Sequence, residues 1–270
     1  MTHTAQIIPE KVTPPFEPPP VTRERLLRTL GESLDTCNST IIHGRAGTGK
    51  TMLAADFARQ CSRAVAWYKL DAPDCELSVF FQYLCASIAE QRPGFGQRVL
   101  ERVGEQPVAA GDVPLLVECF VYELLESNEP LLVVIDDLHL VYDAEWMVPF
   151  FRRLLPLLPR EVHFCLIGRS LPPTPLWRMR SKQTLCVVDE SALAFTLAEA
   201  RTLFTRYGLP AERADAALLQ TRGRAATLDA HAAAAADAAG RPLTPRSRAG
   251  HTERPLRLVK GFRKSSMGTA

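Results

Sequence analysis

The chain has 270 residues, of which 46% are hydrophobic and 23% are charged, and its formal net charge is +2. These values are ordinary for a soluble globular protein with one large domain, or with one domain and part of a second. No stretch reaches the ~18 uninterrupted apolar residues of a membrane-spanning helix, and residues 1–10 lack the apolar core of a signal peptide. Seven cysteines, an odd number without a CxxC pair, indicate reduced thiols and exclude a disulfide framework. We therefore expect a cytoplasmic protein that does not bind membranes.

Residues 1–20 are predicted to form a mobile, proline-rich arm. Five prolines between positions 14 and 20 favour an extended backbone and exclude a helix. We interpret the arm as a stiff leader into the domain, with a PxxP ligand as the alternative. A short helix is expected after Thr22, a suitable N-cap, with Leu26, Leu27 and Leu30 on its apolar face.

Strand signals then alternate with helix signals. Short apolar runs predict strands at residues 40–43, 64–70, 131–135, 162–167 and 185–188. Apolar residues at helical spacing predict helices within residues 50–60, 77–88, 113–124, 150–155 and 197–204. Because such alternation implies parallel crossovers, we expect a three-layer α/β domain over residues 21–195 with a central, mostly parallel five-stranded sheet. Residues 196–221 are expected to begin an incomplete helical or winged-helix extension.

The character of the chain changes after about residue 220. Residues 222–270 contain ten Lys or Arg and three Asp or Glu, a charge of +7, whereas the preceding 221 residues carry −5. Residues 232–239 are all alanine except Asp237, and large apolar residues are sparse beyond them. Such a segment buries too little surface to offset its ordering entropy, so we expect a basic, disordered C-terminal tail. A lone alanine-rich helix near residues 225–239 is the alternative.

A phosphate-binding loop is the firmest functional signal. The pattern GxxxxGK[ST] is matched at every position by Gly44, Arg45, Ala46, Gly47, Thr48, Gly49, Lys50 and Thr51. A predicted strand precedes the loop and a predicted helix follows it. The glycines let successive backbone N–H groups turn towards an anion, and the helix N-terminus adds positive partial charge. We expect Lys50 to contact the β- and γ-phosphates and the Thr51 hydroxyl to coordinate Mg²⁺, so the predicted ligand is a nucleoside triphosphate, foremost ATP.

Two carboxylates end a later apolar strand. Asp136 and Asp137 follow the run of residues 131–135, which is the form of a Walker B strand. Asp136 is predicted to hold the Mg²⁺ shell, and Asp137 to polarise the attacking water. Because strands often end in acidic turn residues, the prediction depends on the phosphate loop upstream.

Three further polar residues follow or interrupt buried strands. Arg169 comes after the strand at residues 162–167, so it is predicted to sense the γ-phosphate or to stabilise its transferring charge, with an exposed loop arginine as the alternative. His163 lies inside an apolar run and is predicted to be a core histidine. His139, after the two carboxylates, either contacts the site or caps a loop.

In their order, these segments resemble the NTPase module of the signal-transduction ATPases with numerous domains (STAND), an AAA ATPase-like group. Within it, the chain is most similar to the large ATP-binding LuxR-type regulators. The resemblance covers roughly residues 11–220 and rests on "KVTPPFEPPPVTRERLL", "HGRAGTGKTMLAADFA", "AVAWYKLDAPDCELSVFFQYL", "LLVVIDDLHLV", "VHFCLIGRSLPPTPLWRMR" and "FTLAEARTLF".

The resemblance implies an ATP-dependent switch. Family members hold ADP in a closed state, self-associate in an open state that ATP favours, and are reset by hydrolysis. The family's phosphate and Mg²⁺ residues map onto Gly49, Lys50 and Thr51. Its metal, water-directing and arginine positions map onto Asp136, Asp137 and Arg169 in that order, and the leader at residues 21–25 is expected near the adenine.

The chain also departs from the family. Family proteins are several times longer and continue with a winged helix, a helical repeat sensor and a helix-turn-helix. Here the pattern fades after residue 220, and Thr221, Arg222, Gly223 and Arg224 stand where the family shows a Gly-Trp stretch. The tail has the composition of a truncated or out-of-frame product. Inducer sensing and DNA binding are therefore not expected of this chain.

Three functions remain open on these grounds. The first is an ATP-binding switch module with slow ATPase activity, part of a transcription regulator that lacks its sensor and DNA-binding parts. The second is a nucleic-acid-associated ATP-binding protein that uses its basic tail for phosphate contacts. The third is a small-molecule kinase on the same core, for which Arg178 and Arg180 would supply basic groups.

Overall fold

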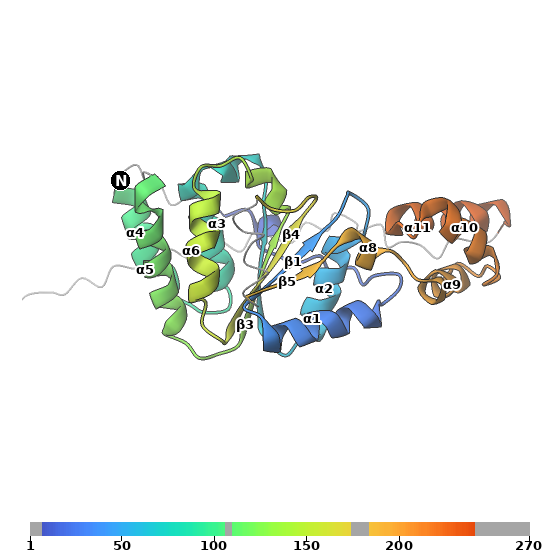
Figure 1. The fold of residues 1–270 in the computed structure, drawn as a ribbon, viewed down its shortest axis with the longest axis horizontal. Helices are drawn as coiled ribbons and strands as arrows, with labels where there is room; N and C mark the ends of the chain where they lie inside the picture. Colours follow the sequence, from blue (N-terminus) through green and yellow to red (C-terminus); the bar gives the residue numbers. More distant parts are fainter. Residues whose placement is uncertain (1–6, 106–109, 174–183, 241–270) are drawn as a thin grey trace, which may run out of the picture.

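The computed structural model describes residues 7–105, 110–173 and 184–240. Their centre is a five-stranded sheet with helices on both faces (Figure 1). Its strands are β1 Ser39–His43, β2 Ala64–Lys69, β3 Leu131–Asp136, β4 Val162–Gly168 and β5 Leu185–Val188. They lie in the order β2-β3-β4-β1-β5, and every neighbouring pair is parallel. The predicted α/β P-loop fold with a five-stranded sheet is confirmed.

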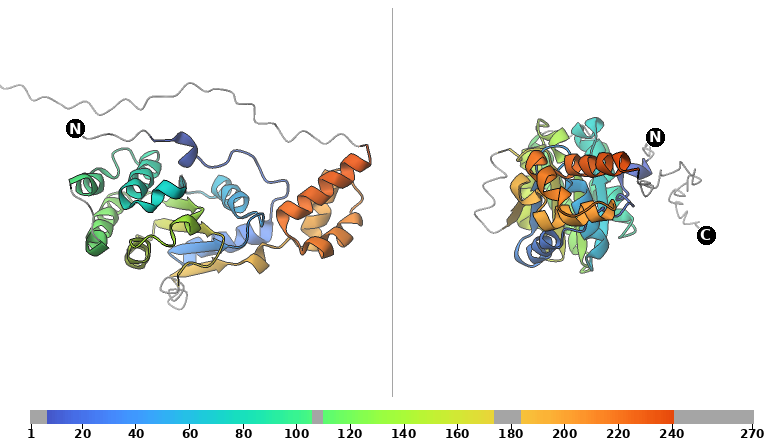
Figure 2. Two further views of the ribbon diagram at one scale, coloured as in Figure 1. Left: turned by 90° about the horizontal axis from the view of Figure 1, so that it is seen from above. Right: turned by 90° about the vertical axis from the view of Figure 1, so that its right-hand side faces the viewer.

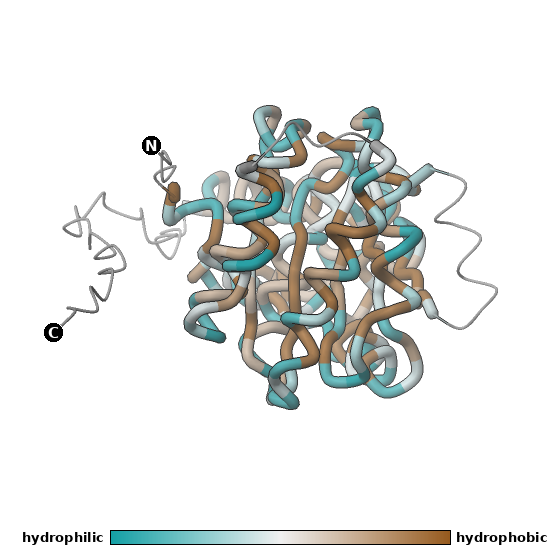
Figure 3. The backbone as a smooth tube through the Cα atoms, turned by 90° about the vertical axis from the view of Figure 1, so that its left-hand side faces the viewer, coloured by the Kyte–Doolittle hydropathy of each residue, from teal (hydrophilic) through white to brown (hydrophobic). Residues whose placement is uncertain are grey.

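The central strand β3 shows why each face carries a helical layer. Leu131, Val133 and Ile135 belong to one hydrophobic core, whereas Leu132 and Val134 belong to the other. This follows because successive side chains of a strand point to opposite faces. Figure 3 shows apolar stretches alternating with hydrophilic ones along the backbone. A strand buried on both faces must be apolar throughout, as β3 is up to Asp136.

The two helical layers differ in size. One face carries α3 Leu77–Ala89, α4 Gln97–Glu105, α5 Val113–Leu125 and α6 Met147–Leu157 (Figure 1). The other carries α1 Glu24–Thr36 and α2 Lys50–Gln60. Short 3₁₀ turns occur at η1 Pro9–Lys11, η2 Ala72–Cys75, η3 Ala110–Asp112 and η4 Leu138–Val141. Among the helices of the described residues, none is long and apolar enough to cross a lipid bilayer.

The register of the sheet brings three chain segments to one edge. His43 at the end of β1 pairs with Gly168 at the end of β4, and Lys69 pairs with Asp136 at the end of β3. The Gly44 N–H donates to the Gly168 carbonyl at 3.3 Å. Since all strands are parallel, the segments that follow β1, β3 and β4 lie together at the carboxyl edge, where ligands bind in open α/β sheets.

The C-terminal helices form a small unit with its own core. After α8 Glu190–Leu193, the chain forms α9 Leu197–Arg206, α10 Arg213–Thr221 and α11 Ala225–Ala238 (Figure 2). The structure corrects the predicted tail here, because α11 is neither disordered nor a lone helix. It buries Leu228, Ala232 and Ala236 against Leu203 and Phe204 of α9. Residues 241–270, which hold the rest of the predicted tail, lie outside the described residues.

The N-terminal arm is attached to the domain rather than mobile over residues 7–20. Lys11 is buried, and its ammonium lies 2.7 Å from Asp71, 2.6 Å from Asp74 and 3.9 Å from the centre of the Tyr83 ring. Asp74 is fully buried, so the pair has little access to water. Figure 2 shows the segment running along one side of the molecule from this point towards the C-terminal helices. The pairing of Lys11 with the buried Asp74 holds the arm against the domain, although its prolines favour an extended, solvated backbone.

Candidate nucleotide-binding site

The phosphate loop lies between the end of β1 and the start of α2. Gly47 and Gly49 have φ values of +80° and +83°, in the left-handed region that glycine adopts without strain. A Cβ at Gly47 would lie 3.0 Å from the Cβ of Ala226, at the start of α11. These glycines therefore serve two needs, the turn of the loop itself and the close approach of another helix.

Lys50 is buried at the first position of α2. Its ammonium donates to the carbonyls of Gly44 at 2.6 Å and Arg45 at 3.0 Å, so the side chain folds back across the loop. Burial lowers the pKa of Lys50, and the negative charges of Asp136 and Asp137 oppose that shift. A cation held within the loop and kept near carboxylates is suited to an anionic ligand such as a polyphosphate.

Thr51 and Asp136 meet across the site. The Thr51 hydroxyl donates to the Asp136 carboxylate, with Oγ1 to Oδ2 and Oδ1 distances of 2.9 and 3.2 Å. Burial, and after it the charge of Asp137, raises the pKa of Asp136 to about 6. Hydroxyl and carboxylate oxygens are the ligands that Mg²⁺ prefers, and this ion takes few of them from protein when phosphates and water supply the rest. The pair therefore fits the predicted ion, although no cluster of three or more His, Cys, Asp or Glu suited to a metal occurs within the described ranges.

Asp137 adopts an unusual backbone conformation. Its φ is +59°, and it is one of two non-glycine residues with positive φ in the described part of the chain. Its N–H donates to Asp136 Oδ1 at 2.9 Å, which fixes the turn directly after β3. The side chain is 31% exposed, and a carboxylate oxygen lies 3.8 Å from Nδ1 of His139. Strained residues of this kind concentrate at functional sites, and here the strain keeps a carboxylate accessible next to the buried Asp136.

The remaining predicted polar residues divide between site and core. Arg169 is exposed directly after β4. Burial lowers the pKa of Lys50 and of His139, and the positive charge of the nearby Arg169 adds to both shifts. His139 is largely buried, and its Nδ1 has no hydrogen-bond partner among the described residues. His163 is a core residue, as predicted, with Nε2 2.9 Å from Thr40 Oγ1 and Nδ1 3.1 Å from the Cys37 carbonyl.

Comparison with known proteins agrees with this geometry. The AAA ATPase domain family matches residues 19–167, more than half of the chain. The chain belongs to the AAA ATPase domain family. Residues 19–167 include the phosphate loop, the strand that ends in Asp136, and β4 up to Ile167. Nucleotide binding follows from membership, usually with Mg²⁺. The LuxR-type subgroup is a finer assignment and stays a prediction.

Solved structures place this AAA ATPase domain among related folds. A STAND protein with a tetratricopeptide repeat sensor from Pyrococcus horikoshii is similar with a TM-score of 0.55 and 18% identity, over 76% of this chain and 28% of that protein. A Walker-type ATPase of Pyrococcus abyssi is similar with a TM-score of 0.52 and 13% identity, over 81% of this chain and 69% of that one. At these identities the similarity shows the fold alone. The chain thus spans little more than a quarter of the length of the P. horikoshii protein.

Sequence reasoning missed three charged residues that contact the loop of this AAA ATPase domain. Arg23 precedes α1, and its guanidinium donates to the Gly49 carbonyl at 2.7 Å. Arg224 precedes α11, and its Nε donates to the Ala46 carbonyl at 3.0 Å. Glu190 accepts from the Arg45 N–H at 2.9 Å and from its Nε at 2.7 Å. Only Arg23 had a sequence signal, its place in the leader expected near the nucleotide.

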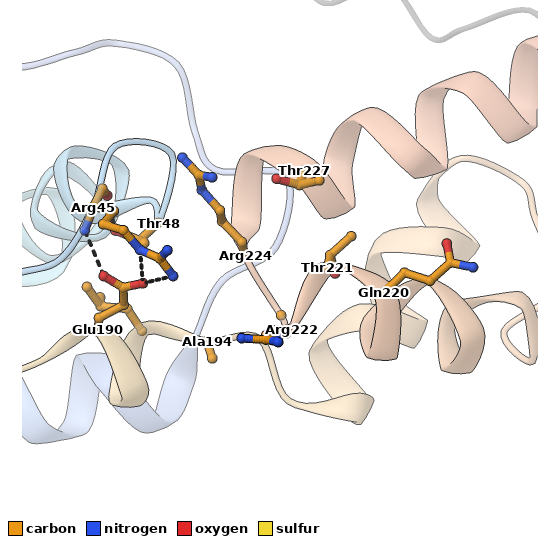
Figure 4. Close-up of a pocket in the computed structure, with 11 residues that line it drawn as sticks. Arg45, Thr48, Glu190, Ala194, Gln220, Thr221, Arg222, Arg224 and Thr227 are labelled. Atoms are coloured by element: carbon orange, nitrogen blue, oxygen red, sulfur yellow. Dashed lines mark hydrogen bonds and ion pairs between the residues drawn. The ribbon is translucent and has the colours of Figure 1, made fainter.

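A pocket of about 280 Å³ lies between the loop and the C-terminal helices (Figure 4). Its lining residues are Arg45, Thr48, Glu190, Leu193, Ala194, Gln220, Thr221, Arg222, Gly223, Arg224 and Thr227. The Arg45–Glu190 pair closes one side, as the dashed lines of Figure 4 show. The stretch where the sequence departs from the LuxR-type pattern thus lies beside the phosphate loop. Arg178 and Arg180, which the kinase alternative needs, lie outside the described residues.

Proposed function

We propose that this AAA ATPase domain is an ATP-binding switch module that hydrolyses ATP slowly. The observation that carries the proposal is the contact of Thr51 with Asp136 beside a buried Lys50, since it brings the two halves of a nucleotide site together. Both motifs were predicted from distant parts of the chain, and only the fold joins them.

Each loop residue has a role in this proposal. The N–H groups from Gly44 to Thr51 and the N-terminus of α2 bind the phosphates, and Lys50 moves from the loop carbonyls to the β- and γ-phosphates. Thr51 and Asp136 would hold Mg²⁺, which would neutralise part of the phosphate charge when bound. Burial raises the pKa of Asp136 to about 6, and a cation beside it would favour the ionised carboxylate. The buried Asp136 is therefore suited to a position next to a metal ion.

Asp137 and Arg169 are the proposed catalytic residues. The accessible Asp137 carboxylate orients a water molecule for in-line attack on the γ-phosphate and accepts a hydrogen bond from it. Arg169 and Lys50, close enough for their charges to interact, stabilise the charge that spreads onto the leaving phosphate oxygens. The Nδ1 of His139 has no hydrogen-bond partner among the described residues and lies 3.8 Å from the Asp137 carboxylate.

Switching requires that ATP and ADP favour different states of the protein. A nucleotide shifts such a balance only by its difference in affinity for the two states. The fold similarity to a STAND protein supports a switch, and self-association in the ATP state is part of the proposal. Membership of the LuxR-type regulators, and hence a role in transcription, rests on the order of sequence motifs.

Calorimetric titration with ATP and with ADP, each with Mg²⁺, tests the proposal when light scattering is measured in the same samples. We expect both nucleotides to bind at one site per chain, and the scattering mass to rise with ATP but not with ADP. Equal mass in both samples would contradict the switch while leaving nucleotide binding intact. Phosphate release that depended strictly on a small-molecule acceptor would favour the kinase instead.

A further inference from the structure

The outer side of the phosphate loop is hydrogen-bonded by residues outside the motif. The Ala46 carbonyl accepts from Arg224 Nε at 3.0 Å, and the Gly47 carbonyl accepts from the Ala226 N–H at 2.9 Å. Arg23 donates to the carbonyls of the next two loop residues. Its Nη1 lies 3.4 Å from the Thr48 carbonyl and its Nη2 lies 2.7 Å from the Gly49 carbonyl. Four consecutive carbonyls thus each have a donor from the start of α1 or of α11.

This arrangement bears directly on anion binding. In a phosphate loop the N–H groups must point inward to the anion, so the carbonyls of the same peptides point outward. An outward carbonyl that already accepts a hydrogen bond keeps its peptide in that orientation, and it polarises the N–H on the other side. Donors on the outer side therefore prepare the inner side for phosphate before any ligand arrives.

The surroundings of Arg23 and Arg224 favour this role. Arg23 is buried, and burial lowers its pKa to about 10, so its guanidinium is still charged at neutral pH. Arg224 stands at the N-cap of α11 without capping it through its side chain, which leaves the guanidinium to reach Ala46. Gly49 is needed for the approach, because a Cβ there would lie 3.1 Å from Arg23 and 3.3 Å from the Cβ of Ala225.

We propose that Arg23, Arg224 and the Ala226 N–H form a carbonyl brace, which positions the loop and makes nucleotide affinity depend on the docking of the α9–α11 unit. Arg23 and Arg224 are positioning residues in this scheme, since they touch the loop backbone and not the nucleotide. The inference rests on the proposed function only in that the loop binds a nucleotide.

The brace also connects the loop to the hinge of the helical unit. Arg23 Nη1 donates to the Leu193 carbonyl at 3.0 Å as well as to Thr48. Arg25 donates to the carbonyls of Ala192 at 2.7 Å and Ala194 at 2.6 Å, just before α9. A movement of the unit would remove the Arg224 and Ala226 donors from the loop, whereas the Arg23 donors belong to the α/β domain. By thermodynamic linkage, phosphate bound in the loop must then stabilise the docked unit by the same free energy.

Arg224→Ala is the test variant, because the side chain is partly exposed and its removal leaves no cavity in the core. Arg213→Ala is the matched control: it removes one positive charge from the same unit, and Arg213 forms no hydrogen bond or ion pair through its side chain within the described residues. The dissociation constants of ATP and ADP with Mg²⁺ are measured for both variants and for Arg224→Lys, which keeps the charge but not the forked donor.

We expect Arg224→Ala to weaken the binding of ATP and of ADP by the same factor, about fivefold, because it loses about one hydrogen bond. Arg224→Lys should fall between it and the parent, and Arg213→Ala should match the parent. A loss confined to ATP would overturn the brace, because it would mean that Arg224 contacts the γ-phosphate. Unchanged affinity for both nucleotides would overturn it as well.

Hydrogen–deuterium exchange without nucleotide separates the brace from the proposed function. Amides of residues 44–51 should exchange several-fold faster in Arg224→Ala than in the parent and in Arg213→Ala. Faster exchange in a protein that binds neither nucleotide would refute the proposed function and still support the brace. Equal exchange in all three proteins would refute the brace, whatever the nucleotide affinities are.

Discussion

The buried ring of His163 predicts how the stability of this protein responds to acid. The side chain is 2% exposed, and its two nitrogens contact Thr40 and the Cys37 carbonyl. Burial, aided by the charge of Arg63, lowers the pKa of His163 from 6.5 to about 4. In the folded protein the His163 ring therefore stays neutral at pH values at which the same ring takes up a proton in the unfolded chain.

The sign and the size of the effect follow from this difference. The pKa of His163 is lower in the folded state than in the unfolded chain. Its contribution to the free energy of unfolding is therefore fully present above pH 6.5 and is lost as the pH falls towards 4. Proton linkage gives a loss of about 2 kcal/mol in the free energy of unfolding at pH 5, and about 3 kcal/mol once the pH is below 4. His43 and His139, whose pKa values burial also lowers, act in the same direction.

Urea unfolding of the parent and of His163→Gln at pH 8 and pH 5 isolates this contribution. The variant should have a lower free energy of unfolding than the parent at pH 8. Between pH 8 and pH 5, however, its free energy of unfolding should fall by about 2 kcal/mol less than that of the parent. The contributions of the other histidines cancel in that comparison. His231→Gln, at an exposed position on α11, is the control for the substitution itself. Parallel losses in the parent and in His163→Gln would refute the reasoning.

Two substitutions test the site and the arm. Asp137→Asn keeps the shape and tolerates the positive φ, so nucleotide affinity should stay within about twofold while single-turnover phosphate release falls at least about a hundredfold. Asp143→Asn, exposed in the same region, is the control, and equal turnover in both variants would exclude Asp137 as the water-directing acid. Lys11→Ala leaves the fully buried Asp74 without its cation and should lower the free energy of unfolding by about 3 kcal/mol. A loss below about 1 kcal/mol in urea unfolding would show that the arm is not anchored there.

The sheet could be predicted because its strands are short apolar runs with local signals. The helices α4 and α11 show where that approach ends. In α4 only Val99, Leu100 and Val103 are apolar, and the helix has only nine residues, so the sequence analysis did not predict it. In α11 the buried positions other than Leu228 are alanines, and alanine contributes to a core only where another helix approaches closely. An alanine-rich helix near residues 225–239 was the alternative from the sequence, but its packing against α9 could not be predicted without the neighbouring helices.

The candidate site divides in the same way. The loop, Asp136 and Asp137 were predicted because the chemistry of phosphate and Mg²⁺ requires particular residue types at fixed spacing. Arg23 and Arg224 were missed because they act on backbone carbonyls, which every residue has, so no pattern of side chains marks their targets. The pairing of Lys11 with Asp71 and Asp74 joins residues 60 and more positions apart and likewise leaves no local signal.

Nucleotide binding through Lys50 is the central claim, and titration calorimetry of the parent and of Lys50→Ala with ATP and Mg²⁺ tests it most directly. Lys50 is the cation held within the loop, so its removal should weaken the binding of ATP about tenfold or more. Unfolding curves recorded on the same preparations would establish that both proteins are folded. The account predicts saturable binding of ATP by the parent and a dissociation constant at least about tenfold higher for Lys50→Ala. A folded Lys50→Ala protein that binds ATP as tightly as the parent would contradict it.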